Sequence, residues 1–157
     1  MERVISKDGT PIAFDRLGHG PALILVDGAM CYRGFGPMPA MAKRLASQFT
    51  VFHYDRRGRG ESGDHPDYSV SREIDDLDAV IQQAGGSAFI LGVSSGGALA
   101  LEAAARLRGI SRLAIYEAPF IVDSTHAPLP RTFVSDTRAL VAAGRRGDAV
   151  KKFMRLV

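Results

Sequence analysis

Apolar residues in this sequence follow two patterns that alternate along the chain. Strand-like segments are predicted at residues 3–6, 11–17, 22–26, 50–54, 88–93 and 113–116. Between them, apolar residues recur every three or four positions, which predicts helices over residues 38–49, 74–84 and 96–107. Two leading strands followed by repeated strand–helix units predict an α/β fold, with a mainly parallel sheet and helices on both of its faces.

Local turn and cap signals agree with these elements. Asp8-Gly9 is a hairpin signal between the first two strands. The helix around residues 74–84 has two candidate N-caps, Ser69 and Ser71, and Gly85-Gly86 ends it. Its apolar stripe predicts an amphipathic helix whose opposite, polar face carries the acidic residues Glu73, Asp75, Asp76 and Asp78.

The alternation of strands and helices stops after Pro119. Pro128 and Pro130 predict a loop, and two helical patterns follow at residues 132–143 and 148–157 with no strand between them. We therefore divide the chain into a core, residues 1–119, and a second region, residues 120–157. The last helical pattern contains no stop signal before the final residue, so we expect the sequence to be cut within an element.

Composition adds few constraints beyond this pattern. The chain has 157 residues, of which 46% are hydrophobic and 24% charged, as in one ordinary soluble domain. Cys31 is the only cysteine, which excludes a disulfide scaffold. The uncharged stretch 79–101 contains five glycines and three serines, so it predicts a helix end, a strand and a turn, and no membrane span. No secretion signal precedes the first strand, and we expect a cytoplasmic location.

Charge is distributed unevenly, but it indicates no polyanionic partner. Residues 1–105 carry 10 Lys+Arg and 13 Asp+Glu, a net charge of −3, whereas residues 106–157 carry 10 and 4, a net charge of +6. The basic residues of the second part are scattered along helical patterns without interleaved aromatic residues, so we interpret them as a solvated surface and expect no nucleic-acid partner. No cluster of His, Asp or Glu has the spacing of metal ligands, so we expect no metal.

The segment Gly92-Val93-Ser94-Ser95-Gly96 carries the clearest chemical signal. It places Gly-x-Ser-x-Gly between a predicted strand and a predicted helix. A residue at the apex of such a tight turn has strained backbone angles, and its neighbours at two positions on either side must lack side chains; Gly92 and Gly96 meet this need. Ser94 is then the exposed nucleophile, and the N–H group of Ser95 at the helix start can stabilise an oxyanion. The alternative is a chance match in a glycine-rich turn.

With this motif, the chain resembles the α/β-hydrolase family. Two further segments support the resemblance, Asp55-Arg56-Arg57-Gly58-Arg59-Gly60-Glu61-Ser62 and Val26-Asp27-Gly28-Ala29. The first looks like the family's Asp-x-Arg-Gly-x-Gly-x-Ser loop, which we expect to lie beside the pocket and to be braced by Asp55 and Arg57. The second occupies the place of the family's oxyanion loop, where His-Gly is usual and Asp27 is a departure; the N–H group of Ala29 would be the second oxyanion donor. The resemblance also implies that residues 120–157 begin a helical cap.

A nucleotide site is an alternative reading of the second segment. Gly58-Arg59-Gly60-Glu61-Ser62-Gly63 matches Gly-x-Gly-x-x-Gly and follows a predicted strand. A dinucleotide fingerprint needs its third glycine within the opening helix, and the segment 64–67 intervenes here before a helix can start. We therefore favour a loop beside the pocket and expect no cofactor.

The base and the acid of a catalytic triad are harder to assign. His126 is the only histidine after Ser94, and it falls in the predicted cap loop, so we interpret it as a surface or pocket-rim residue. The resemblance implies a catalytic histidine beyond residue 157. Glu117 follows the strand after the nucleophile helix, where some members of the family carry the acid; a structural carboxylate at the cap hinge is an equally good reading.

These observations predict a serine hydrolase that cleaves an ester-like acyl bond of a small molecule through an acyl-enzyme at Ser94. Serine at this position argues against the relatives that use a carboxylate nucleophile. Because the triad is incomplete, we expect activity to depend on further chain or on another subunit, as a homo-oligomer or a complementing chain. The alternative function is a non-catalytic module of the same fold that binds a small apolar ligand.

Overall fold

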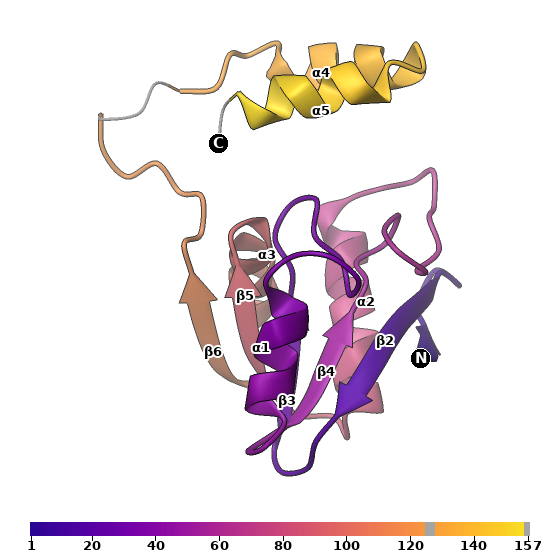
Figure 1. Ribbon diagram of the computed structural model, residues 1–157, viewed down its shortest axis with the longest axis vertical. Helices are drawn as coiled ribbons and strands as arrows, with labels where there is room; N and C mark the ends of the chain where they lie inside the picture. The colour runs from indigo at the N-terminus through magenta and orange to yellow at the C-terminus, as the bar shows by residue number, and fades with distance from the viewer. Residues whose placement is uncertain (125–127, 156–157) are drawn as a thin grey trace. The chain divides into compact units, whose positions relative to one another are not determined.

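A computed structural model describes residues 1–124 and 128–155 of the chain (Figure 1). The chain divides into two compact units, residues 1–119 and residues 120–157. Within the described residues, no helix combines the length and the apolar character needed to cross a membrane. Each unit is described by itself.

The first unit contains a six-stranded sheet in the order β1-β2-β4-β3-β5-β6. Its strands are β1 (Glu2–Ile5), β2 (Pro11–Leu17), β3 (Ala22–Val26), β4 (Thr50–Tyr54), β5 (Ala88–Val93) and β6 (Ile110–Tyr116). β1 and β2 form an antiparallel hairpin and β2 pairs antiparallel with β4, whereas β4, β3, β5 and β6 are parallel. The predicted α/β fold with a mainly parallel sheet is therefore confirmed.

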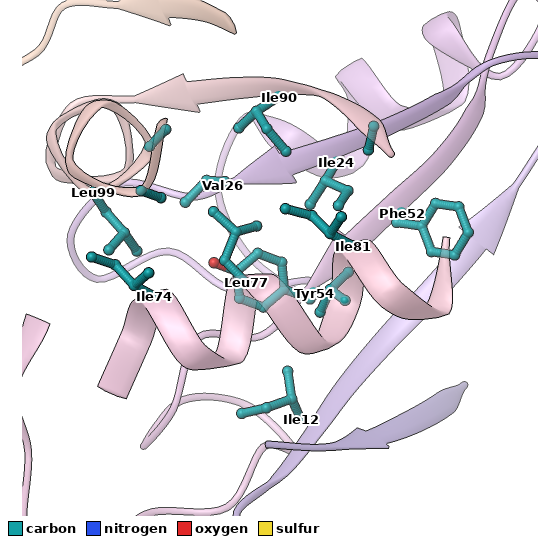
Figure 2. Close-up of a cluster of buried hydrophobic side chains, with 14 of the residues drawn as sticks. Ile12, Ile24, Val26, Phe52, Tyr54, Ile74, Leu77, Ile81, Ile90 and Leu99 are labelled. Carbon is teal, nitrogen blue, oxygen red and sulfur yellow. The ribbon is translucent and has the colours of Figure 1, made fainter. Parts of the chain in front are cut away.

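Helices cover both faces of this sheet. On one face α2 (Val70–Gln83) and α3 (Ser95–Ala104) pack on a core that includes Ile24, Ile90 and Leu77 (Figure 2). On the other face α1 (Met38–Leu45) packs through Met38 and Ala42 on apolar residues of β3 and β4. A groove of about 630 Å³ opens on this second face, lined by Leu23, Leu45, Phe49, Phe89, Ile90, Leu91, Arg112, Leu113 and Ala114.

Element boundaries differ from the sequence expectations at several ends. α1 ends at Leu45, four residues early, because Phe49 packs edge-on against Phe89 of β5 and does not continue the helix. β6 begins at Ile110, three residues early, because Ile110 and Arg112 pair with β5. α3 covers 95–104 where 96–107 was expected. Ser69 is the N-cap of α2, since its Oγ accepts the N–H of Arg72 at 3.3 Å.

The polar face of α2, opposite its apolar stripe, is only partly exposed to solvent. Glu73 and Asp76 are buried, with 2% and 1% of their surface exposed. The physical reason is that both carboxylates form ion pairs with buried arginines, Arg56 and Arg57, of the loop after β4. α2 therefore contributes counter-charges to the interior as well as apolar packing.

The second unit consists of two helices, α4 (Phe133–Ala142) and α5 (Arg146–Met154). Lys152 of α5 joins them, since its Nζ donates to Asp136 Oδ2 at 2.8 Å and lies 5.7 Å from the centre of the Phe133 ring. Ala149 is the one residue of the two helices that is buried. The helix expected over 148–157 begins at Arg146 and ends at Met154.

Candidate active site

The order of the strands brings the loops after β3 and β5 together. β3 and β5 are neighbours in the sheet, but the chain leaves β3 toward β4 on one side and leaves β5 toward β6 on the other. The carboxyl ends of two parallel strands at such a topological switch point border a crevice, which is the usual ligand site of open α/β sheets. Gly28 follows β3 and Ser94 follows β5 at this point.

Ser94 occupies a sharp turn between β5 and α3. Its backbone has φ 52° and ψ −124°, a region that residues with a side chain rarely adopt. The turn is held by the Ser94 N–H group, which donates to the Tyr116 carbonyl at 2.9 Å, and by the Ser94 carbonyl, which accepts the N–H of Gly97 at 2.9 Å. Ser94 is partly exposed, so its hydroxyl is not enclosed by packing.

The glycines around Ser94 have no room for a side chain. A Cβ on Gly92 would lie 2.6 Å from the Gly96 carbonyl oxygen, and a Cβ on Gly96 would lie 2.2 Å from the Val26 carbonyl oxygen. A Cβ on Gly28 would lie 3.2 Å from the Ser94 Cβ. Each obstacle at Gly92 and Gly96 is backbone, so it cannot move aside as a flexible side chain would. The start of α3 therefore rests directly on the end of β3.

The two predicted oxyanion donors follow the two segments that meet here, with Ser95 at the start of α3 and Ala29 in the loop after β3. Ser95 is the first residue of α3, where an N–H group has no acceptor within the helix. Ala29 follows Gly28, and Met30 after it has a positive φ of 62°, so the chain turns sharply here. The roles of the Ala29 and Ser95 N–H groups remain predictions.

Glu117 directly follows β6, the strand beside the nucleophile strand. It is exposed and has a φ of 49°, so two successive strands each lead into a residue with a strained backbone, Ser94 and Glu117. No hydrogen bond joins Glu117 to another described residue, and its role as the acid stays a prediction. His126 lies outside the described residues.

No base for Ser94 appears in the described part of the chain. His53 is buried and His65 accepts a bond from the backbone of Asp67, and neither these nor His19 bonds to Ser94 within residues 1–124 and 128–155. The same residues contain no group of three or more His, Cys, Asp or Glu that could hold a metal ion.

Comparison with known proteins agrees with this geometry. A model of the "Alpha/beta hydrolase family" matches residues 23–156. The chain belongs to the alpha/beta hydrolase family. This confirms the resemblance that the nucleophile turn and its two companion segments indicated.

Several solved structures resemble this hydrolase-family chain. An alpha/beta hydrolase from Sphaerobacter thermophilus DSM 20745 is 52% identical with a TM-score of 0.92, over 99% of this chain and 60% of that one. An N-formylmaleamic acid deformylase from Pseudomonas putida S16 is 27% identical with a TM-score of 0.70, over 88% and 55%. An esterase from Rhodococcus sp. ECU1013 is 25% identical with a TM-score of 0.64, over 73% and 44%. The chain thus spans 60% or less of these proteins, and no curated protein matches it.

Asp27, the departure from the family's usual His-Gly, is part of a buried pair. Its Oδ2 lies 2.7 Å from Nε2 of His53, and the two residues are 1% and 3% exposed. Oδ1 of Asp27 is buried without a hydrogen-bond partner in the described structure. In this member of the family, a carboxylate and an imidazole from neighbouring strand ends therefore lie beneath the predicted oxyanion loop.

Asp55 is enclosed by the loop that sequence analysis expected it to brace. Its carboxylate accepts the backbone N–H groups of Arg33 at 2.7 Å and Glu61 at 2.9 Å. A Cβ on Gly60, which has a φ of 51°, would lie 2.2 Å from Asp55 Oδ2, so only glycine lets the loop close around this carboxylate.

Arg57, the second residue expected to brace the loop, is fully buried between two carboxylates. Nε and Nη2 each donate to Asp76 at 2.7 Å, and Nη1 donates to Asp8 at 2.9 Å. The hydrogen bonds to Asp76 outweigh burial and raise the pKa of Arg57, while the bond from Arg57 holds the pKa of Asp8 well below its ordinary value. Arg57 thereby ties the loop after β4 to α2 and to the hairpin turn.

Arg56, to which no role was assigned from the sequence, links both sides of the predicted oxyanion site. Its Nη1 donates to the Asp27 carbonyl at 3.0 Å and to Ser95 Oγ at 3.1 Å, while Nε and Nη2 donate to Glu73 at 2.5 and 2.7 Å. Burial opposes ionisation of Glu73, but the bonds and charge of Arg56, with a further bond from Tyr68, outweigh it and lower the pKa of Glu73.

Proposed function

We propose that the protein to which this chain belongs is a serine hydrolase that cleaves an ester-like acyl bond of a small molecule through an acyl-enzyme at Ser94. The observation that carries the proposal is the backbone of Ser94, with φ 52° between β5 and α3 and a partly exposed side chain. Strain of this kind costs on the order of 1–3 kcal/mol and persists where a function depends on the conformation.

The chemistry follows from the groups around that turn. Oγ of Ser94 would attack the carbonyl carbon of the substrate and pass its proton to a base, while the carbonyl oxygen takes up negative charge. The Ser95 and Ala29 N–H groups would hold that charge, aided by the N-terminal end of the α3 dipole. Loss of the protonated alcohol leaves an ester on Ser94, and attack by water then releases the acid and restores the hydroxyl.

The comparisons support hydrolysis in general terms. The family model is that of the alpha/beta hydrolases, and the similar structures include an esterase and a deformylase. Ester cleavage, a small-molecule substrate and Glu117 as the acid extend beyond that support. The family resemblance implies that the base is a histidine. If His126 is not that histidine, further residues of the protein or a partner chain would have to provide the base.

A fluorophosphonate probe tests the nucleophile directly. We expect the whole protein to which this chain belongs, with its base present, to be labelled at Ser94, as located by peptide mass, and Ser94→Ala to abolish labelling. Ser47→Ala is the matched control, because Ser47 is exposed and its Oγ donates only to the nearby Arg44 carbonyl. Labelling that is absent in the folded whole protein, judged by circular dichroism, would overturn the proposal and favour the alternative module that binds a ligand without catalysis.

The same probe tests Glu117. If this carboxylate is the acid, Glu117→Gln lowers the labelling rate at least tenfold without changing the circular dichroism, because a base loses its orienting partner. A rate within twofold of wild type would show that Glu117 is a structural carboxylate.

A further inference from the structure

The loop after β4 carries three arginines whose guanidinium groups are bound by similar contacts, except at one edge of Arg59. Nη1 of Arg56, Arg57 and Arg59 binds the surrounding protein in each case. The opposite edge, formed by Nε and Nη2, holds the carboxylate of Glu73 in Arg56 and that of Asp76 in Arg57. In Arg59 no described residue bonds to that edge.

The free edge of Arg59 is open to solvent. Nη1 donates to the Gly28 carbonyl at 2.7 Å and contacts the Cys31 carbonyl at 3.4 Å, and these bonds fix the guanidinium. Arg59 is partly exposed, and its Nε and Nη2 are not among the enclosed polar atoms that lack a partner in the described structure. No carboxylate of the described residues forms an ion pair with it.

The charge of Arg59 is therefore poorly compensated. Burial and the like charge of Arg56 lower the pKa of Arg59, and the opposing influence of Glu73 is smaller. Glu73 is already bound by Arg56 and by the Tyr68 hydroxyl. A positive group that is partly desolvated and lacks a counter-charge is a favourable site for an anion.

Arg59 is bound to the loop that faces the proposed nucleophile. It binds the carbonyl of Gly28, and a Cβ on that same residue would lie 3.2 Å from the Ser94 Cβ. The α3 N-terminus, which begins after Ser94, adds a positive dipole end at the same place. An anionic group held by Arg59 would thus belong to the molecule that reaches Ser94.

We propose that Arg59 binds a carboxylate of the substrate through Nε and Nη2, so that this hydrolase selects acyl substrates that carry a carboxylate near the scissile bond. This inference rests on the proposed function at Ser94. A planar two-oxygen group fits the two parallel N–H donors of that edge, in the geometry that Glu73 and Asp76 show on the neighbouring arginines.

The test compares two ligands of similar size that differ in one end group, a carboxylate in succinamate and a neutral amide in succinamide. Each is titrated into the wild-type chain at low salt, and binding is followed by the Nε–H resonances of the arginines in ¹H–¹⁵N spectra. We expect succinamate to bind at least tenfold more tightly and to shift the resonance of Arg59, which Arg59→Lys identifies by its loss. Equal binding of the two ligands to wild type would overturn the proposal.

Substitutions of Arg59 and of a control arginine test whether Arg59 causes the preference for succinamate. Arg59→Met should reduce the preference for succinamate to within twofold, whereas Arg59→Lys should keep part of it. Arg16→Met removes the same charge from an exposed position on β2 and should leave the preference unchanged. A preference that survives in Arg59→Met would overturn the proposal. If Arg59→Met does not fold, the comparison of ligands on wild type still decides.

This experiment needs no activated serine, so its failure is separate from that of the proposed function. Labelling of Ser94 without a preference for succinamate would refute the role of Arg59 alone. A preference for succinamate, together with a Ser94 that does not react in the whole protein, would refute the hydrolase and retain the carboxylate site.

Discussion

Glu73→Gln tests the buried ion pair beneath the proposed active site. The substitution keeps the size of the side chain and removes its charge, which leaves the Arg56 guanidinium buried without a counter-ion. Both residues are at most 5% exposed, so water cannot replace the lost partner without opening the structure. Removing one member of a buried pair costs about 3–5 kcal/mol.

The lower end of that range applies here. Arg56 keeps two hydrogen bonds outside the pair, to the Asp27 carbonyl and to Ser95 Oγ, so its charge is not left wholly unsatisfied. We therefore expect the free energy of unfolding to fall by about 3 kcal/mol. With a denaturant slope of about 1–3 kcal/mol per molar urea, the midpoint of unfolding should fall by about 1–3 M.

Urea unfolding followed by circular dichroism measures this loss. Glu102→Gln is the matched control, because Glu102 of α3 and Arg106, just beyond the end of that helix, form an exposed pair with half or more of each side chain in solvent, and its loss should cost at most about 0.5 kcal/mol. Arg56→Met with Glu73→Met should recover at least half of the loss, since no charge is then buried. A midpoint for Glu73→Gln equal to that of Glu102→Gln would refute the reasoning.

Two further predictions concern the nucleophile turn and the response to acid. Gly96→Ala should destabilise the chain by about 3 kcal/mol or abolish folding, because its Cβ would lie 2.2 Å from the Val26 carbonyl oxygen; Gly147→Ala, with nothing within 4 Å, should be neutral or stabilising in the same thermal melts. The pKa of Glu73 is lowered from 4.5 because Arg56 outweighs burial, so its stabilisation is present above pH 4.5 and is lost as the pH falls through the lower folded value. Urea midpoints from pH 7 to 3 should fall less steeply in Glu73→Gln, and parallel slopes would contradict this assignment.

The sequence predicted the sheet well because its central strands are buried on both faces. A strand such as Ala22–Val26 must be apolar at every position, and that pattern is hard to mistake for a helix bounded by caps. β6 was recognised only in its second half, since its first residues include Ser111 and Arg112, which are exposed and carry no apolar signal. These first residues of β6 form a strand because they pair with Ala88 and Phe89 of β5, about twenty residues earlier, and a local pattern does not reveal that pairing.

The nucleophile turn was also predictable, because its steric demands are local. Gly92 and Gly96 leave a signature within five residues, and the structure shows the backbone contacts that require them. The charged network was not predictable in the same way. Arg56 meets Glu73 over 17 residues, and at helical spacing Glu73 resembles a solvated carboxylate. The one available signal was a pair of adjacent arginines in the loop that follows a buried strand.

The Asp27–His53 pair illustrates a third limit. β3 and β4 lie side by side with Leu25 opposite His53, so Asp27, two residues beyond, reaches the imidazole across the strand ends. In the sequence, Asp27 is a departure from the family's usual His-Gly, and His53 is one residue within a predicted strand. Their contact follows from strand register, which a single sequence does not display.

The position of β6 at the rim of the sheet bears on how the chain behaves at high concentration. Its backbone pairs with β5 on one side only within the described residues, and Ile115 and Tyr116 are 40% and 60% exposed. Such a rim is a template on which a second polypeptide can add a strand, the usual first step of aggregation. Arg112, exposed on the same strand, is the kind of charged gatekeeper that slows this growth, so its replacement by an aliphatic residue should lower the concentration at which this chain by itself precipitates.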